Sequence, residues 1–212
     1  MRLDDLKFFN QSARSLAPLL LGKILCCEKN GQVLRSKITE VEAYCGEEDS
    51  ACHSAHGKTE RTKTMWCDGG TVYVYLCYGM HNMLNIVCAG QRPEAVLIRG
   101  VEDAKGPGRV TKYFGITKEQ NGVDLKTSTT LWLEDAPNET HHHTGPRIGI
   151  DYAREPDKSA PDAWGLPVVN RAPSPRCHGW GRTVLYFLSE KLSKCGSPMK
   201  VYPSGFSTVP MK

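Results

Sequence analysis

The sequence predicts a single α+β domain, in which several short strands form a sheet and a few helices flank it. Two observations support this class. The chain has 212 residues, which is the size of one domain. Apolar stretches of strand length recur between turn signals, whereas few segments show helical spacing. Because no apolar run reaches about 18 residues, no transmembrane helix and no membrane partner are expected.

The first predicted element is a helix over residues 8–22, since leucines recur there at helical spacing and Gly22 is a good C-terminal stop. The pair Asn30-Gly31 is a tight-turn signal. It separates two predicted strands, at residues 23–27 and 33–43. The first third of the chain is therefore expected to form a helix followed by a hairpin.

The second strand of this hairpin changes character along its length. The two-residue period of a strand places four of its side chains on one face, which are Leu34, Ile38, Glu40 and Glu42. This face begins apolar and ends in two carboxylates. We therefore expect the end of the strand to open into a functional site.

A long loop rich in charge, glycine and histidine is predicted over residues 46–70, and such loops often carry function. The segment from Gly106 to Arg109 breaks the chain and opens a short helix through Phe114. The histidines at 141–143 are expected in a solvated loop. Further strands are predicted at residues 71–76, 84–88, 95–100, 130–134 and 147–150.

After Tyr152 the composition shifts toward proline, serine and glycine. The sequence therefore divides into a main domain over residues 1–156 and a divergent tail over 157–212, expected to be poorly ordered except near 182–192. The main domain carries 19 Lys/Arg and 20 Asp/Glu, and the tail carries 8 and 3. Bulk charge thus gives no reason for the main domain to bind nucleic acid. Local clusters must do so, namely Lys58, Arg61 and Lys63, and Lys105, Arg109 and Lys112.

The nine cysteines show no CxxC spacing, and the N-terminus lacks an apolar signal core. We expect reduced thiols packed as small hydrophobes. We expect the protein in the cytoplasm, associated with the nucleoid in a bacterium, or in the nucleus of a eukaryote. A zinc hydrolase using the cysteines and histidines is a weaker alternative, and no metal or cofactor is expected.

Two pieces of sequence point together to chemistry on a nucleobase. Glu42 ends a predicted strand beside Tyr44, and aromatic side chains crowd the segment from Tyr73 to His81. A carboxylate can act as a general base, and aromatic rings can hold a base that has left the helix. Each feature alone also has a structural reading, which is a salt bridge for Glu42 and core packing for the tyrosine pair Tyr73 and Tyr75.

Tyr78 precedes Gly79 near the predicted connection between two strands. A large ring at a hairpin tip is more often exposed than buried. Minor-groove binders insert exposed apolar side chains between base steps. An enzyme that acts on a duplex base must rotate it out of the stack. Tyr78 is therefore a candidate wedge.

These residues, in this order, resemble the 3-methyladenine (alkyladenine) DNA glycosylase family. The resemblance covers roughly residues 10–153, and several motifs in register are far more specific than one short pattern. The matching segments are residues 20–25, 38–44, 49–54, 70–80, 84–86, 96–99 and 106–112. The resemblance implies a curved, mostly antiparallel sheet of the formyltransferase C-terminal-domain type.

By this resemblance, Glu42 matches the glutamate that activates water, and Arg99 matches an arginine near that water and the phosphate. Tyr78 matches the intercalating wedge. Tyr44, His53 and Tyr75 match the residues that hold the flipped base. Asn85 matches the asparagine whose bulk disfavours the amino group of an unmodified guanine. Separately, basic residues expected to contact the DNA backbone are Arg109, Lys112 and Lys63.

The expected activity is that of a monofunctional DNA glycosylase in base excision repair. It would hydrolytically excise purines of the 3-methyladenine, 7-methylguanine and hypoxanthine class from double-stranded DNA, acting as a monomer. No lyase step is expected, because no lysine stands at a matched catalytic position. The alternative is a catalytically impaired protein that binds damaged DNA.

That alternative arises because the chain departs from the family pattern near its end. Residues 162–165, Asp-Ala-Trp-Gly, stand where the family has a Trp-Arg-Phe-like strand. We hypothesise that the sequence from about residue 162 is out of frame or replaced. The altered strand is then expected to leave an unpaired sheet edge near the site. A Trp-Arg-Phe-like continuation in another reading frame across codon 161 would support this hypothesis, and its absence would refute it.

Overall fold

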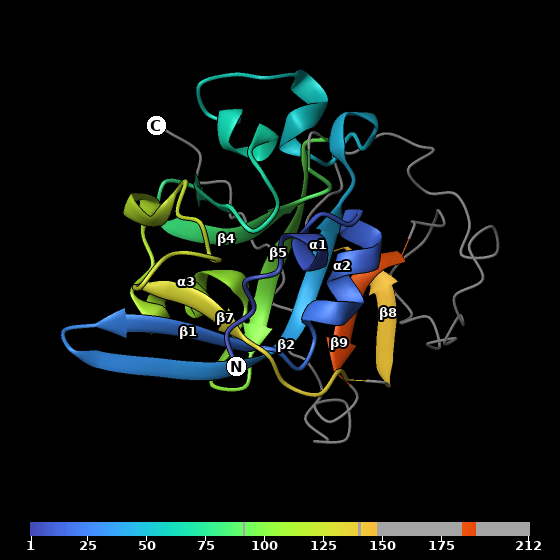
Figure 1. The fold of residues 1–212 in the computed structure, drawn as a ribbon. Coiled ribbons are helices and arrows are strands. Elements are labelled where there is room, and N and C mark those ends of the chain that lie inside the picture. Colours follow the sequence, from blue (N-terminus) through green and yellow to red (C-terminus); the bar gives the residue numbers. More distant parts are fainter. Residues whose placement is uncertain (91, 140, 148–183, 190–212) are drawn as a thin grey trace, which may run out of the picture.

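The computed structural model describes residues 1–90, 92–139, 141–147 and 184–189 (Figure 1). The strands are β1 (Ile24–Lys29), β2 (Gln32–Tyr44), β3 (Val72–Cys77), β4 (His81–Cys88), β5 (Glu94–Val101), β6 (Ala104–Lys105), β7 (Leu131–Glu134), β8 (His142–Pro146) and β9 (Val184–Ser189). The α-helices are α1 (Leu6–Phe9), α2 (Ala13–Leu20) and α3 (Pro107–Phe114). Four short 3-10 helices complete the description: η1 (Gly46–Glu48), η2 (His53–His56), η3 (Lys63–Trp66) and η4 (Lys118–Gln120).

The strands form one antiparallel sheet in the order β3-β4-β5-β2-β1-β7, with β9 on β2 and β8 on β9. The long strand β2 takes part in two regions of it. Its first half pairs with β1 in the hairpin that projects at the left of Figure 1. Its second half pairs with β5 and β9. This curled antiparallel sheet with few helices confirms the predicted α+β class.

The two faces of the sheet carry different clusters of buried side chains. The main core lies on the face covered by α2 and α3, and it includes Val72 and Val74 of β3. Alternation along the same strand turns Tyr73 and Tyr75 to the opposite face. There they join a smaller cluster under the segment 46–70, which Figure 1 shows above the end of the sheet.

The helix predicted over residues 8–22 is two helices, α1 and α2. The chain breaks at Asn10, and Ser12 caps the second helix by accepting a hydrogen bond from the Ser15 amide at 3.2 Å. The cap favours a new helix start over continuation of the first. Among the described residues, no helix is long and apolar enough to span a bilayer.

The predicted single face of Leu34, Ile38, Glu40 and Glu42 is wrong. Ile38 lies in the main core together with Val41, three residues later, so the alternation changes phase between them. The pairing of β2 with β5 shifts register on both sides of Glu40. Such a bulge re-aims the following side chains. Glu40 and Glu42 therefore face away from the core that holds Ile38.

Two expectations for the late chain also need correction. Of the histidines predicted in a loop, His142 and His143 belong to β8 (His142–Pro146), and His141 precedes it. The strand predicted at 147–150 is not seen, because Arg147 follows β8 and 148–150 lie outside the described residues. The sheet edge expected to be unpaired is occupied, because β9 pairs with β2. This strand falls within residues 182–192, where the sequence allowed regular structure. The rest of the predicted tail lies outside the described residues.

Candidate active site

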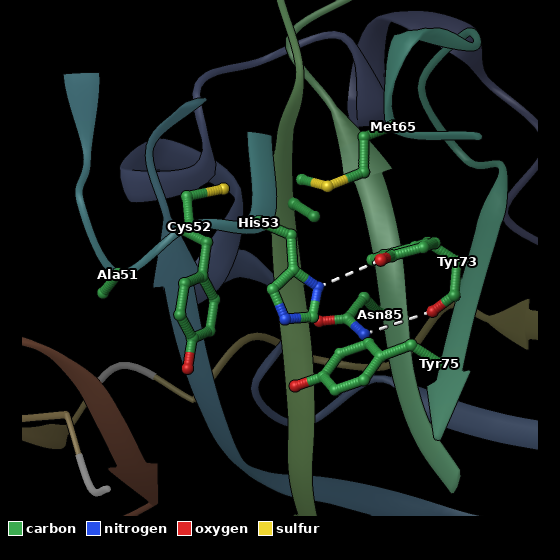
Figure 2. A pocket seen from close by; sticks show the side chains of 9 residues that line it. Ala51, Cys52, His53, Met65, Tyr73, Tyr75 and Asn85 are labelled. Carbon is green, nitrogen blue, oxygen red and sulfur yellow. Dashed lines mark hydrogen bonds between the residues drawn. The ribbon is translucent and has the colours of Figure 1, made fainter. Parts of the chain in front are cut away.

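A pocket opens on the sheet face opposite the main core (Figure 2). Its empty space is about 330 Å³, which includes open solvent at the mouth. Strands β2, β3, β4 and β5 and the segment 46–70 together supply its walls. The lining residues are Tyr44, Ala51, Cys52, His53, Met65, Tyr73, Tyr75, Asn85 and Ala95.

Three aromatic rings pack closely in this pocket. The His53 and Tyr75 ring centroids lie 4.4 Å apart, and those of Tyr73 and Tyr75 lie 5.6 Å apart. His53 Nδ1 shares a hydrogen bond of 3.0 Å with the Tyr73 hydroxyl, which Figure 2 marks by a dashed line. The loop carrying His53 thus folds back onto β3, and its imidazole meets the Tyr75 ring edge-on, with 68° between the two planes.

The histidine in this group is held neutral. Burial, followed by the charges of Arg61 and His56, lowers the pKa of His53 from 6.5 to about 4. Burial raises the pKa of Tyr73 to about 12. At neutral pH the aromatic walls therefore add no charge to the pocket, although the Arg61 guanidinium lies 5.9 Å from the Tyr75 ring centroid.

Asn85 lies on β4 directly opposite Tyr73 of β3. Its Nδ2 donates to the carbonyl oxygens of Tyr73 at 3.1 Å and Met83 at 3.2 Å. These two bonds fix the amide plane against the backbone. Asn85 is 4% exposed, so it forms a rigid polar part of the pocket wall.

The predicted catalytic carboxylate contacts one of the residues that line the pocket, Tyr44. Glu42 is completely buried, and its Oε2 accepts a hydrogen bond of 3.1 Å from the Tyr44 hydroxyl. Its Oε1 accepts from Arg99 Nη1 at 3.3 Å. Arg99 Nε donates to Glu40 Oε1 at 2.8 Å. The structure thus brings the predicted pair Glu42 and Arg99 together, with Glu40 as a second carboxylate on the guanidinium.

The Glu42 carboxylate is not itself among the lining side chains, whereas its hydrogen-bond partner Tyr44 is. Burial raises the pKa of Tyr44 well above 10, and the charge of Glu42 acts in the same direction. The Tyr44 hydroxyl therefore stays protonated and remains a hydrogen-bond donor to the carboxylate. This hydrogen bond connects the aromatic pocket to the Glu42 carboxylate, the group that could accept a proton.

A buried ion pair next to this site was not predicted as part of it. Arg147 binds Asp49 through Nη1–Oδ2 at 2.6 Å and Nη2–Oδ1 at 2.8 Å. The guanidinium also lies over the Tyr44 ring, with its Cζ 4.7 Å from the centroid. The two residues are 98 positions apart, and no sequence period connects them.

Tyr78 stands at the exposed tip of the β3–β4 hairpin, with 88% of its surface accessible. The Met80 amide donates to the Cys77 carbonyl at 3.1 Å to close the turn. Tyr78 has φ +51° and Gly79 has φ +71°. Such turns favour glycine, asparagine or aspartate, so an exposed tyrosine there is unusual. The predicted exposure is confirmed.

The sequence and the relatives of this chain fit the geometry. A family model described as methylpurine-DNA glycosylase matches residues 7–105 and 102–165. The chain belongs to the methylpurine-DNA glycosylase family. The resemblance noted in the sequence is thereby confirmed.

Bacterial relatives of this methylpurine-DNA glycosylase family member are about 40% identical to it over the aligned residues. One from Natranaerobius thermophilus is 39% identical over 176 residues, covering 71% of this chain and 89% of the relative. One from Borrelia garinii subsp. bavariensis is 42% identical over 167 residues (72% and 90%), and one from Bdellovibrio bacteriovorus is 40% identical over 171 (72% and 89%). Each of the three is named as a candidate 3-methyladenine DNA glycosylase.

All predicted site residues of this family member fall inside the matched range, and β9 lies beyond it.

The residues predicted to contact the DNA backbone do not line the pocket. Arg109 and Lys112 are exposed on α3, and a Cβ on Gly108 would lie 3.2 Å from the ring of His81, which directly follows the turn of the Tyr78 hairpin. Helix α3 therefore begins beside that hairpin.

Lys63 is exposed on η3 and forms an ion pair of 2.7 Å with Glu60, so part of its charge is already compensated. Among the described residues of this family member, no group of three or more histidine, cysteine or carboxylate side chains could hold a metal ion.

Proposed function

We propose that this protein is a monofunctional DNA glycosylase that flips alkylated or deaminated purines out of duplex DNA and releases them by hydrolysis. The substrates would include 3-methyladenine, 7-methylguanine and hypoxanthine. One observation carries the proposal: the Glu42 carboxylate is joined by a 3.1 Å hydrogen bond to Tyr44, a wall of an open aromatic pocket. The names of the relatives point to the same chemistry.

In this proposal, the flipped purine enters between Tyr44 on one side and His53 and Tyr75 on the other. Electron-rich ring faces attract a cationic alkylated purine. Neutral His53 avoids the repulsion that an imidazolium would add. Asn85 is fixed by its two backbone hydrogen bonds, so it would exclude the amino group of an unmodified guanine. Pocket shape and charge would thus select damaged purines.

The reaction would be hydrolysis at the sugar. A water molecule attacks C1′, Glu42 accepts its proton, and the bond from C1′ to the purine nitrogen breaks with the electron pair going to the base. A base that is already cationic leaves as a neutral molecule, whereas neutral hypoxanthine leaves as an anion that takes up a proton from water. We infer that water reaches Glu42 beside the Tyr44 hydroxyl once the sugar is bound, because the carboxylate is fully covered in the free protein.

Extrusion of the base would rely on Tyr78, whose exposed ring fills the gap left in the stack. Arg109 and Lys112 on α3, beside the same hairpin, would contact phosphates. A lyase step would need an amine as nucleophile. No lysine is among the described residues that line the pocket. The protein would act as a monomer on chromosomal DNA.

The decisive experiment measures base release from duplexes that contain a single hypoxanthine or 1,N6-ethenoadenine. Glu42→Gln should abolish release while binding of the lesion duplex persists. Glu48→Gln is the matched control, because it changes an exposed carboxylate in the segment 46–70. This variant should keep full activity. Binding without release by the unmodified protein would instead support a damaged-DNA binding protein, and neither binding nor release would reject both.

A further inference from the structure

Asp49 is the centre of a buried hydrogen-bond cluster beside the pocket. Its carboxylate accepts the amides of Cys45 at 2.9 Å and Ala51 at 3.1 Å. It also accepts two hydrogen bonds from Arg147. Burial opposes ionisation here, but the Arg147 hydrogen bonds and charge hold the pKa of Asp49 below its ordinary value. The carboxylate therefore remains charged and fixes the start of the loop that carries His53.

Arg147 connects this loop to the strand that carries the catalytic candidate. Its Nη1 donates to the Ala43 carbonyl of β2 at 3.1 Å as well as to Asp49. The neighbouring Tyr44 ring lies under the guanidinium, 4.7 Å from Cζ. Arg147 is 3% exposed and does not line the pocket, whereas Tyr44 does. The guanidinium therefore covers the ring face that is turned away from the pocket.

We propose that Arg147 and Asp49 are positioning residues for base excision, which fix the ring plane of Tyr44 and, through its hydroxyl, the carboxylate of Glu42. This inference rests on the proposed glycosylase function. The guanidinium backs the ring on which the flipped purine would stack. The same ring donates the 3.1 Å hydrogen bond to Glu42, so a tilt of Tyr44 would disturb both the stack and the carboxylate.

The chemistry of the pair explains why arginine stands here. A planar guanidinium can bind a carboxylate with two parallel bonds and stack on a ring at the same time, which a lysine ammonium cannot do. The charge of Asp49 compensates that of Arg147. Without this partner, a cation 4.7 Å behind the ring would disfavour a cationic purine on its other face.

The variants Arg147→Lys and Asp49→Asn test this proposal. Lysine keeps the charge and loses the planar fork, and asparagine keeps the shape and loses the charge. Lys23→Met is the matched control. It breaks another ion pair, between the buried Lys23 and the partly exposed Asp135 at 2.6 Å, away from the pocket. Thermal midpoints measured for all three variants separate loss of stability from loss of positioning.

The first measurement needs no DNA. Proteins with 13C-labelled tyrosine rings give one signal for Tyr44, assigned through Tyr44→Phe. Arg147→Lys should shift or broaden this signal, and Lys23→Met should leave it unchanged. If Arg147→Lys folds and its Tyr44 signal stays in place, the positioning proposal is rejected, whether or not the protein releases bases.

The second measurement follows base release and ethenoadenine fluorescence with enzyme in excess over the lesion duplex. Arg147→Lys should slow release by about 30-fold or more and reduce the fluorescence change of the flipped base, with affinity for undamaged duplex within about threefold. Lys23→Met should release base at the original rate. Equal rates for Arg147→Lys and the starting protein would overturn the proposal. No release by the starting protein would reject the proposed function, and the ring signal would still decide the positioning role.

Discussion

The hydroxyl of Tyr44 donates a hydrogen bond of 3.1 Å to Oε2 of Glu42, two residues earlier on the same strand. Residues two apart on a strand point to the same side, so this contact is available without any long-range rearrangement. Tyr44 therefore both lines the pocket and donates a hydrogen bond to the carboxylate. Binding of the base and activation of water are therefore expected to depend on a common side chain.

Replacement of Tyr44 by phenylalanine tests this connection. The ring surface persists, and a hydrogen bond to a charged group, worth about 1.5–3 kcal/mol, is lost, so base release should slow about 10- to 100-fold. Binding of lesion duplex should change little. Single-turnover release from a hypoxanthine duplex is the measurement. Tyr113→Phe removes a hydroxyl from α3 and serves as the control, and an unaltered rate in Tyr44→Phe would contradict the prediction.

Tyr78 offers a substitution with opposite effects on stability and function. Its φ of +51° is strained for a tyrosine, so Tyr78→Gly should raise the free energy of unfolding by about 1 kcal/mol. The same change removes the wedge and should weaken binding and release of the lesion base by about tenfold or more. Denaturant unfolding and base release are measured together.

Tyr78→Ala separates the two effects of that substitution. Alanine lacks the ring but keeps the strained backbone, so it should lose function without the gain in stability. If glycine and alanine at this position give the same stability, the backbone is not strained there.

His53 predicts how stability changes with pH. Its pKa is about 4 in the folded protein and 6.5 when unfolded, so between these values the unfolded chain binds more protons. The contribution of neutral His53 to the free energy of unfolding is fully present above pH 6.5 and is lost as the pH falls toward 4. After allowance for partial exposure, stability should fall by about 2 kcal/mol more between pH 7 and pH 4.5 than in His53→Gln. Equal losses in both proteins would show that His53 is not held neutral by the fold.

The salt dependence of DNA binding tests the basic residues. Arg109→Ala and Lys112→Ala should each lower the slope of log affinity against log salt by about 1, if each contacts a phosphate. Lys63→Ala should lower it less, because Lys63 already pairs with Glu60. Fluorescence anisotropy with undamaged duplex at several salt concentrations gives the slopes. An unchanged slope in the α3 variants would remove that helix from the DNA interface.

Local signals in the sequence were sufficient for much of the fold. The turn signal Asn30-Gly31 and apolar alternation located β1, β2, β3 and β5 to within one or two residues, because side-chain alternation and turn chemistry are local properties. The helix predicted over residues 8–22 was wrong near its start, since the Ser12 cap begins a new helix there. Strand β8 was missed because its histidines look polar in sequence.

For the site, the sequence by itself determined which chemical groups are present: a carboxylate next to Tyr44, a tyrosine pair on β3, and an aromatic residue before Gly79. Only the tertiary structure decided how these groups are arranged. The bulge in β2 turns Glu42 away from the face of Ile38, and the fold places Arg147 behind Tyr44. Phase shifts and contacts across 98 residues depend on the packing of the whole sheet, and no local pattern in the chain encodes them.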